Sequence, residues 1–216
     1  MTDRSTEAAI RQLIIDTCRR LADTKLVYGT AGNVSARLGD RILISPSTVP
    51  YDELTPELIC EVRMDGTVPP GQPARASSET PLHLELYRSF DAAAVVHVHS
   101  PAAVAAGLIT AEIPPVHYMI RQFGGPVRVA DYATFGSTEL AANVQAAMTG
   151  RTAALMRNHG AVAVGSTLDE AFERCAQLEW LCDVYLRARS AGTPRALPEE
   201  ELRVVADAAA ERGYRL

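Results

Sequence analysis

Two histidines separated by one residue, His97 and His99, are the residues of this chain best suited to chemistry. They end a short apolar run, residues 95–99, which predicts a buried strand, and alternate residues of a strand point to the same side. Ser100 and Pro101 follow, and both favour a helix start at that point. Two imidazoles that project together are half of a zinc site, although such histidines can also donate to backbone carbonyls alone.

A third imidazole and a carboxylate elsewhere in the chain could complete such a site. His159 stands in a tight Asn-His-Gly turn between two apolar segments, which predicts a position at a sheet edge. Glu79 precedes a helix start, where the helix dipole alone would also favour a carboxylate. One carboxylate and three imidazoles would supply the ligands of a catalytic zinc ion and leave a position for substrate. His83, one helical turn beyond Glu79, is interpreted as structural.

Short segments rich in glycine and serine could hold an anion. Backbone N–H groups in glycine-containing turns, and hydroxyls near loop or helix starts, are typical anion donors, although the same residues also serve as ordinary turns and caps. Neither of the two common glycine-rich nucleotide motifs is present. The candidate anion-binding residues are Gly32, Asn33, Ser47, Thr48, Ser77 and Ser78.

The composition is that of an ordinary globular protein of 216 residues, 47% hydrophobic and 22% charged. A net charge of -5 argues against nucleic acid or an anionic membrane as partner, but it leaves a small phosphorylated substrate open. No apolar run is long enough to span a bilayer, and the first residues lack the apolar core of a signal peptide. Four scattered cysteines without a C-x-x-C motif predict reduced, buried thiols in a cytoplasmic protein.

Apolar periodicity and turn residues predict the order of the elements. Helices are expected over residues 6–24, 80–90, 101–107, 167–190 and 198–212. Strands are expected over residues 34–38, 41–45, 59–64, 95–99, 152–157 and 161–165. Strands and helices do not alternate regularly, which favours a single α+β domain over residues 1–216, of the three-layer α/β/α type with a largely antiparallel central sheet.

The chain resembles the class II aldolase/adducin family, and within it the aldolases that act on L-fuculose 1-phosphate. The resemblance runs in matching order and spacing between about residues 28 and 187, through the segments GTAGNVS, ISPSTVPYDELT, SSET, VVHVHS, PPVHYMI, DYATFGSTEL and NHGAVAVGSTLDEA. It implies that His97, His99 and His159 hold a zinc ion, one per subunit. It also implies that Glu79 is the fourth, exchangeable ligand and the proton-transfer base.

The same resemblance implies the roles of the remaining site residues. The six candidate anion-binding residues would hold the substrate phosphate, although Thr48 stands where the family pattern carries glycine. Tyr118 would serve the aldehyde side, and Phe135 would form part of an apolar substrate wall. Tyr214 is matched more weakly to a tyrosine that closes over the site, because it falls about two residues later than the pattern. In the family, active sites lie between the subunits of a cyclic homotetramer.

The sequence therefore predicts a zinc-dependent lyase that reversibly cleaves a ketose 1-phosphate into dihydroxyacetone phosphate and a short aldehyde. L-Fuculose 1-phosphate and a 5-deoxypentulose 1-phosphate are both candidate substrates, and another divalent metal could replace zinc. Alternatives on the same scaffold are a sugar-phosphate epimerase, dehydratase or decarboxylase; the epimerases of the family carry Asp at the position of Glu79. A metal-free, adducin-like binding module is the alternative from another class, and the presence of all four metal-ligating residues argues against it.

Overall fold

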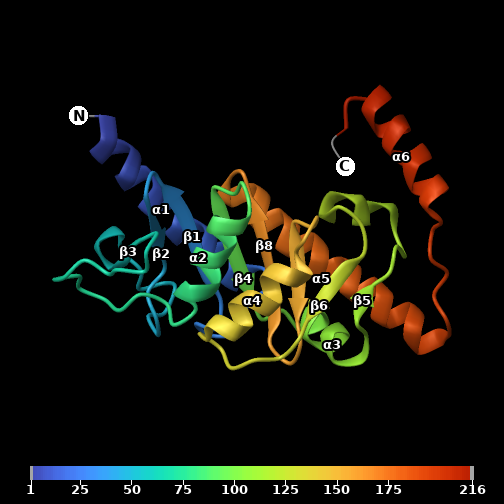
Figure 1. Cartoon of the computed structure of the whole chain (residues 1–216), viewed down its shortest axis with the longest axis horizontal. Helices are drawn as coiled ribbons and strands as arrows, with labels where there is room; N and C mark the ends of the chain where they lie inside the picture. Colours follow the sequence, from blue (N-terminus) through green and yellow to red (C-terminus); the bar gives the residue numbers. More distant parts are fainter. Residues whose placement is uncertain (1, 215–216) are drawn as a thin grey trace.

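An eight-stranded mixed sheet forms the centre of the computed structural model, which describes residues 2–214 (Figure 1). The strands lie in the order β3-β2-β1-β4-β8-β7-β6-β5, and β6 and β7 are the parallel pair among otherwise antiparallel neighbours. Their bounds are β1 Asn33–Leu38, β2 Arg41–Ile44, β3 Cys60–Arg63, β4 Ala94–Val98, β5 Glu112–Ile113, β6 Val127–Ala130, β7 Ala153–Met156 and β8 Gly160–Gly165. The predicted α+β class with a largely antiparallel sheet is confirmed.

Helices cover both faces of this sheet. One layer contains α1 Thr2–Asp23, α3 Pro101–Ile109 and α5 Leu168–Ala191, and the other contains α2 Thr80–Ser89 and α4 Thr138–Ala147. The described residues also form two short 3-10 helices, η1 Pro56–Leu58 and η2 Tyr118–Phe123. The last helix, α6 Glu199–Glu211, stands away from the three layers and contacts η2 (Figure 1).

Alternation along the central strands divides the buried side chains between two cores. On β4, Val96 and Val98 belong to the core under α1, α3 and α5, whereas Val95 belongs to the core under α2 and α4. His97 lies two residues after Val95 on this strand, so its side chain points to the same side of the sheet, the side covered by α2. Asn33 of β1 is the register partner of His97, and it therefore also lies on that side.

Two features of the fold depart from the sequence prediction. The apolar pattern did not predict α4, η2, β5 or β6, because these segments are short or rich in alanine. Ser100 is the residue that precedes α3, as expected, but its side chain makes no capping hydrogen bond. Instead the Glu179 carboxylate of α5 accepts from the backbone N–H groups of Ala102 and Ala103, both at 2.8 Å. The packing of α5 on α3 brings this stronger, charged acceptor to the helix end.

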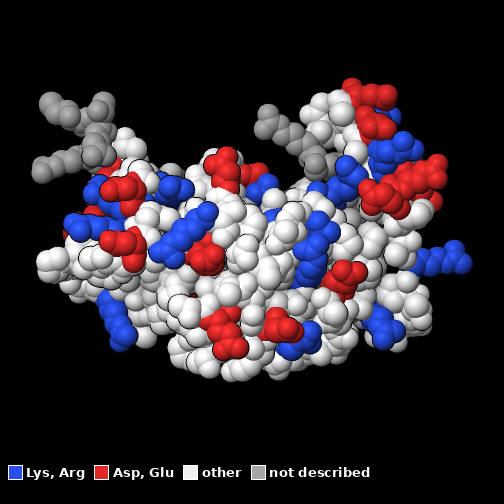
Figure 2. Space-filling model, viewed as in Figure 1, with Lys and Arg blue, Asp and Glu red and all other residues white. Residues whose placement is uncertain are grey.

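Charges of both signs are interspersed over the face of the molecule in Figure 2, and both occur along α6. Within residues 2–214, no helix has the length and apolar character needed to cross a membrane.

Candidate metal centre and active site

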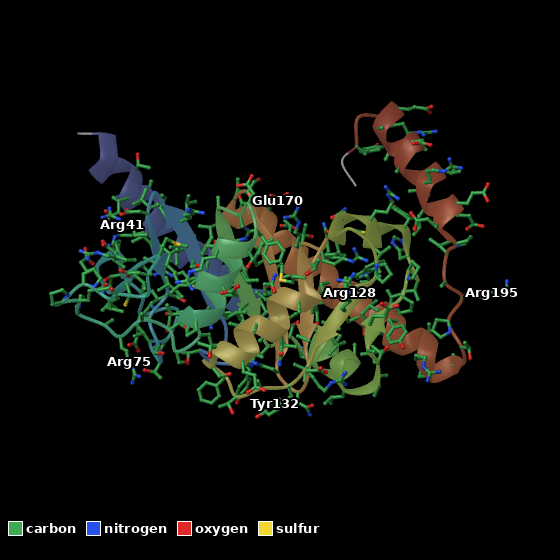
Figure 3. All side chains as sticks on the ribbon, viewed as in Figure 1. Arg41, Arg75, Arg128, Tyr132, Glu170 and Arg195 are labelled. Carbon is green, nitrogen blue, oxygen red and sulfur yellow. The ribbon has the colours of Figure 1, made fainter. Side chains whose placement is uncertain are left out.

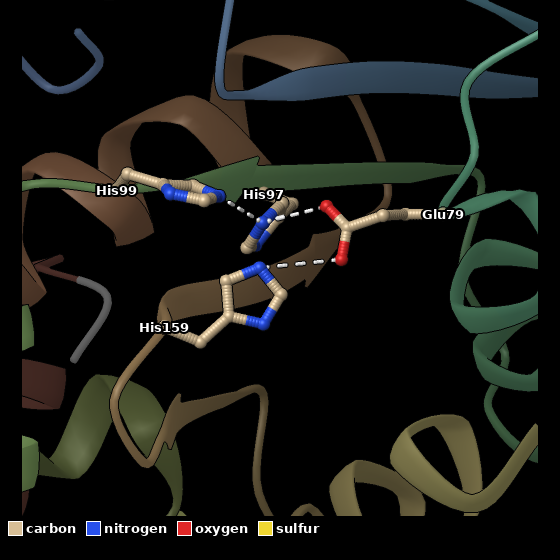
Figure 4. A group of neighbouring side chains, drawn as sticks. All are labelled: Glu79, His97, His99 and His159. Atoms are coloured by element: carbon tan, nitrogen blue, oxygen red, sulfur yellow. Dashed lines mark hydrogen bonds and ion pairs between the residues drawn. The ribbon is translucent and has the colours of Figure 1, made fainter. Parts of the chain in front are cut away.

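Four side chains converge at one point on the α2 side of the sheet (Figure 4). Glu79, His97, His99 and His159 each offer a ligand atom, and these atoms lie within 4.8 Å of one another. The Nε2 atom of His97 is 2.9 Å from that of His99 and 2.9 Å from Glu79 Oε2. His159 Nε2 is 3.3 Å from Glu79 Oε1. The four residues that the sequence proposed as metal ligands therefore come together in space.

Strand pairing brings His159 to the other two histidines, which lie about 60 positions away in the sequence. β4 and β8 are antiparallel neighbours with Val98 opposite Ala161, so the end of β4 adjoins the turn that carries His159. That close approach requires Gly160, because a Cβ atom there would lie 2.1 Å from the carbonyl oxygen of Val98. Glu79 reaches the same point from the other layer, as the residue that precedes α2.

The donor set fits a divalent metal ion. His97 Nδ1–H donates to the carbonyl oxygen of Ala161 at 2.9 Å, which turns the Nε2 atom toward the other ligands, as in most protein metal sites. Glu79 Oε1 is buried and has no hydrogen-bond partner among the described residues, which indicates a lone pair available to a ligand. Three imidazole nitrogens with one carboxylate are typical of zinc, although related metals also accept this set.

The electrostatics of the cluster keep two of the imidazoles neutral. Burial, with the charge of His97, lowers the pKa of His99 to about 3 and that of His159 to about 4. Burial alone would raise the pKa of Glu79, but the charge and hydrogen bond of His97, together with smaller contributions, lower it well below its usual range. Burial alone would lower the pKa of His97, but the Glu79 carboxylate raises it. In the protein alone, these shifts favour a carboxylate at Glu79 and a protonated ring at His97, whose Nε2 atom lies 2.9 Å from Glu79 Oε2. A metal ion binds only neutral imidazole, so it would displace the proton on His97.

A cavity of about 290 Å³ opens beside the cluster. Its walls bring together every residue that the sequence proposed for phosphate binding, along with one proposed for the apolar wall: Gly32, Asn33, Ser47, Thr48, Ser77, Ser78 and Phe135. Thr48 adopts a positive φ of 63°, a conformation that favours the glycine of the family pattern. The structure places these residues in one cavity; their roles stay predictions.

Among the residues of this cavity that the sequence reasoning missed are Asn158 and Tyr132. Asn158 has a positive φ of 56° and lines the cavity next to His159; the Asn-His-Gly turn was the signal that could have identified it. Tyr132 also lines the cavity and lies at the molecular surface (Figure 3). No local pattern distinguishes Tyr132, because its place depends on how the loop before α4 packs.

The structure does not bring Tyr118 and Tyr214 into this cavity. Both line a second, largely apolar cavity of about 430 Å³ between η2 and α6. Tyr118 is 41% exposed and Tyr214 is 68% exposed, and neither lines the cavity beside the metal cluster of its own chain. The fifth histidine, His117, also lies outside the cluster, where its side chain accepts from the backbone N–H of Met119 in η2.

Comparison with known proteins shows which family this chain is similar to. The family model described as Class II Aldolase and Adducin N-terminal domain matches residues 12–186. The chain is 37% identical over 196 residues to 5-methylthioribulose-1-phosphate/5-deoxyribulose-1-phosphate aldolase of Rhodospirillum rubrum, covering 90% of this chain and 88% of that protein. It is 38% identical over 206 residues to L-fuculose phosphate aldolase of Escherichia coli, covering 94% and 95%. A solved structure of L-fuculose 1-phosphate aldolase matches with a TM-score of 0.88 at 35% identity, over 92% of this chain and 95% of that one.

The chain belongs to the class II aldolase and adducin family. The resemblance inferred from the sequence segments is therefore confirmed, and so is the fold that it implied. The relatives named here are aldolases of phosphorylated ketoses. These similarities therefore do not favour an epimerase, a dehydratase, a decarboxylase or a binding module.

Proposed function

We propose that this chain is a metal-dependent aldolase that reversibly cleaves a ketose 1-phosphate into dihydroxyacetone phosphate and a short aldehyde. The observation that carries the proposal is the convergence of three imidazoles and one carboxylate beside a cavity lined by hydroxyls and loop backbone. Relatives named as ketose-phosphate aldolases, 37–38% identical over nine-tenths of the chain or more, support it.

Zinc is the metal that we propose for the cluster, one ion per subunit, held by Glu79, His97, His99 and His159. A bound divalent ion would act as a Lewis acid toward the negative charge that develops when the C3–C4 bond breaks. The imidazole-rich ligand set supports zinc over metals that prefer oxygen ligands.

Glu79 is proposed to move the proton at C3 of the substrate. Asn33 holds its Oε2 atom at 2.9 Å, whereas its Oε1 atom has no hydrogen-bond partner among the described residues, lies 3.3 Å from His159 Nε2 and keeps a lone pair that can accept a proton. In the condensation direction the carboxylate removes the C3 proton of dihydroxyacetone phosphate. In the cleavage direction the protonated carboxyl group returns that proton to the same carbon.

The serine hydroxyls are proposed to bind the substrate phosphate. Ser47 Oγ accepts from the backbone N–H of Ser78, and Ser77 Oγ accepts from the backbone N–H of Glu79, both at 3.2 Å. Because each oxygen is already an acceptor, each hydroxyl proton remains to be donated outward. The Thr48 hydroxyl already donates to the carbonyl oxygen of Ser47 at 2.7 Å. Backbone N–H groups of Gly32, Asn33 and Thr48 would therefore complete an anchor that orients the reacting end.

The proposed assembly is a homotetramer in which Tyr118 and Tyr214 act at the cavity of a neighbouring subunit. Their exposure, and their place in a cavity other than the one beside the cluster of their own chain, support this arrangement. There, in the condensation direction, the Tyr118 hydroxyl would protonate the alkoxide that forms on the aldehyde oxygen, and in the cleavage direction the tyrosinate would take that proton back. Tyr214 would close over the site. Phe135, 65% exposed at the cavity, would contact the apolar end of the aldehyde.

The substrates proposed are L-fuculose 1-phosphate and 5-deoxypentulose 1-phosphates, because both give an aldehyde that ends in a small apolar group. The four cysteines are free and buried, which supports the further proposal that the enzyme works in the reducing cytoplasm.

Metal analysis and an aldol-cleavage assay test the function together. We expect the purified protein to contain about one divalent ion per chain, to lose activity on chelation and to regain it with Zn²⁺. Glu79→Gln should lower kcat by about 100- to 1000-fold, the usual effect of removing one electrostatic or proton-transfer group. Glu85→Gln is the matched control, since Glu85 lies on α2 outside the cavity.

The products distinguish the alternatives. Free aldehyde and dihydroxyacetone phosphate from L-fuculose 1-phosphate or 5-deoxyribulose 1-phosphate would support the aldolase. Isomerised pentose from ribulose 5-phosphate, with no aldehyde released from either ketose 1-phosphate, would identify an epimerase. Full aldol cleavage by metal-free protein would refute the proposed function.

A further inference from the structure

A chain of buried polar side chains runs from α2 through β1 to the Glu79 carboxylate. Tyr87 OH is 2.8 Å from Ser35 Oγ, and Ser35 Oγ is 2.6 Å from His83 Nδ1. His83 Nε2 is 2.5 Å from Asn33 Oδ1, and Asn33 Nδ2 is 2.9 Å from Glu79 Oε2. All five residues are buried, so water is not available to replace a lost partner.

The chemistry of the groups determines the direction of every hydrogen bond in this chain. The Glu79 carboxylate only accepts, so Asn33 must donate through Nδ2 and accept through Oδ1. His83 must then donate through Nε2–H, which leaves Nδ1 as an acceptor when the ring is neutral. Ser35 therefore donates to His83 and accepts from Tyr87. Burial lowers the pKa of His83 to about 3, which is consistent with the neutral ring that this order requires.

Regular secondary structure places these groups in a line. Glu79, His83 and Tyr87 are spaced by four residues, so they lie on one side of α2 and its N-terminal end. Asn33 and Ser35 alternate on β1 and face that side, and Asn33 is the register partner of His97. The interface between α2 and β1 thus connects two regular elements to the carboxylate.

We propose that His83 is a positioning residue for the metal centre, which acts by holding the Asn33 amide so that Glu79 presents a fixed carboxylate. The role of Glu79 itself rests on the proposed function. With Oε2 bound by Asn33, the free Oε1 atom is left facing His159 and the metal ligands. The Ser35 and Tyr87 hydroxyls select the His83 tautomer that can donate to Asn33.

Two amide substitutions at position 83 separate positioning from packing. His83→Gln can place an N–H donor near the original Nε2 atom and keeps the bond to Asn33, but it leaves Ser35 without its acceptor. His83→Asn can accept from Ser35 near the original Nδ1 atom, but it is too short to reach Asn33. Each variant therefore breaks one of the two hydrogen bonds of His83 and keeps the other.

The readout is the Co²⁺ affinity and visible spectrum of the metal-stripped protein, with kcat and KM for cleavage of L-fuculose 1-phosphate. We expect His83→Asn to bind Co²⁺ about 10- to 100-fold more weakly, which is the usual effect of changing a residue that supports a metal ligand. Its visible spectrum should be altered, and its kcat should fall while its KM stays near the native value. His83→Gln should remain within about threefold of the native protein in Co²⁺ affinity and kcat, because the inner hydrogen bond survives.

Thermal unfolding of both variants controls for stability. Equal losses of Co²⁺ affinity per folded molecule in the two variants, or no loss in either, would overturn the positioning role. Absence of aldol cleavage in the native protein, with Co²⁺ affinities that still differ between the variants, would reject the proposed function and leave the positioning role standing.

A measurement on the native protein keeps the inference testable if the variants do not fold. Nitrogen-15 NMR of the imidazole rings should show His83 as the neutral Nε2–H tautomer in the metal-stripped protein between pH 5 and 8. A ring protonated on Nδ1 alone, or on both nitrogens, would overturn the proposed order of hydrogen bonds.

Discussion

Replacing Gly160 by alanine should damage the metal centre while leaving all four proposed ligands in place. The added Cβ would lie 2.1 Å from the carbonyl oxygen of Val98 and 3.3 Å from Cα of His99. Carbon–oxygen contacts between strands are normally about 3.3–3.6 Å, so β4 and β8 must move apart locally by about 1 Å. Metal sites tolerate ligand displacements of only about 0.2 Å. His99 directly follows Val98 and His159 directly precedes Gly160, so movement at this contact displaces two of the ligands.

The expected size of the effect follows from these distances. Overpacking of this kind costs about 1–3 kcal/mol of unfolding free energy. For a chain of this length, each kcal/mol lowers the Tm by roughly 2–4 °C. Distortion of the support around metal ligands weakens metal binding by about 10- to 100-fold. A Zn²⁺ competition titration with a chromophoric chelator, together with a thermal melt of the metal-stripped protein, measures both quantities.

Gly192→Ala is the matched control for this substitution. Gly192 follows α5 in extended backbone, and a Cβ there meets no atom within 4 Å. It should leave both the Tm and the zinc affinity unchanged. If Gly160→Ala also bound zinc with native affinity and melted at the native temperature, the close contact between β4 and the β7–β8 turn would not support the site, and the reasoning would be refuted.

Two further predictions concern the backbone of the phosphate loop and the response to acid. At Thr48 the φ of 63° costs any residue with a Cβ atom about 1–2 kcal/mol of folding stability. Glycine avoids this strain, but the extra conformational freedom that it gives the unfolded chain costs about 0.4–1 kcal/mol. Thr48→Gly should therefore stabilise the protein by up to about 1.5 kcal/mol in urea unfolding. Thr48→Ala should not, and a less stable glycine variant would contradict this account. His83 titrates at about 3 when folded and near 6.5 when unfolded, so its contribution to stability is complete above pH 6.5 and is lost as the pH falls toward 3. When the pH falls from 7.5 to 5, protonation of His83 in the unfolded chain should lower the free energy of unfolding of the native protein by about 2 kcal/mol. His83→Gln should not show this loss. Equal pH dependence of urea unfolding in the two proteins would contradict the prediction.

Local patterns were sufficient to predict most elements near the site. The hairpin around Gly39, which adopts a φ of 64°, the helix start after Ser100 and the helix start after Glu79 were all predicted from neighbouring residues. Such features depend on backbone conformation and capping within a few residues, so the sequence contains the information. The interpretation of His83 as structural did not include its hydrogen bond to Asn33, because that contact joins α2 to β1.

By itself, the sequence determined which residue types were available: three imidazoles, one carboxylate before a helix, and loops rich in hydroxyls and glycine. Only the tertiary structure decided that β4 pairs with β8, which brings His159 to His97 and His99, and that Tyr118 and Tyr214 lie in a different cavity. The physical reason is that strand order and helix packing minimise the free energy of the whole chain through contacts distant in sequence. The spacing of residues in the sequence predicts only local structure, because it reflects interactions between residues that are close along the chain.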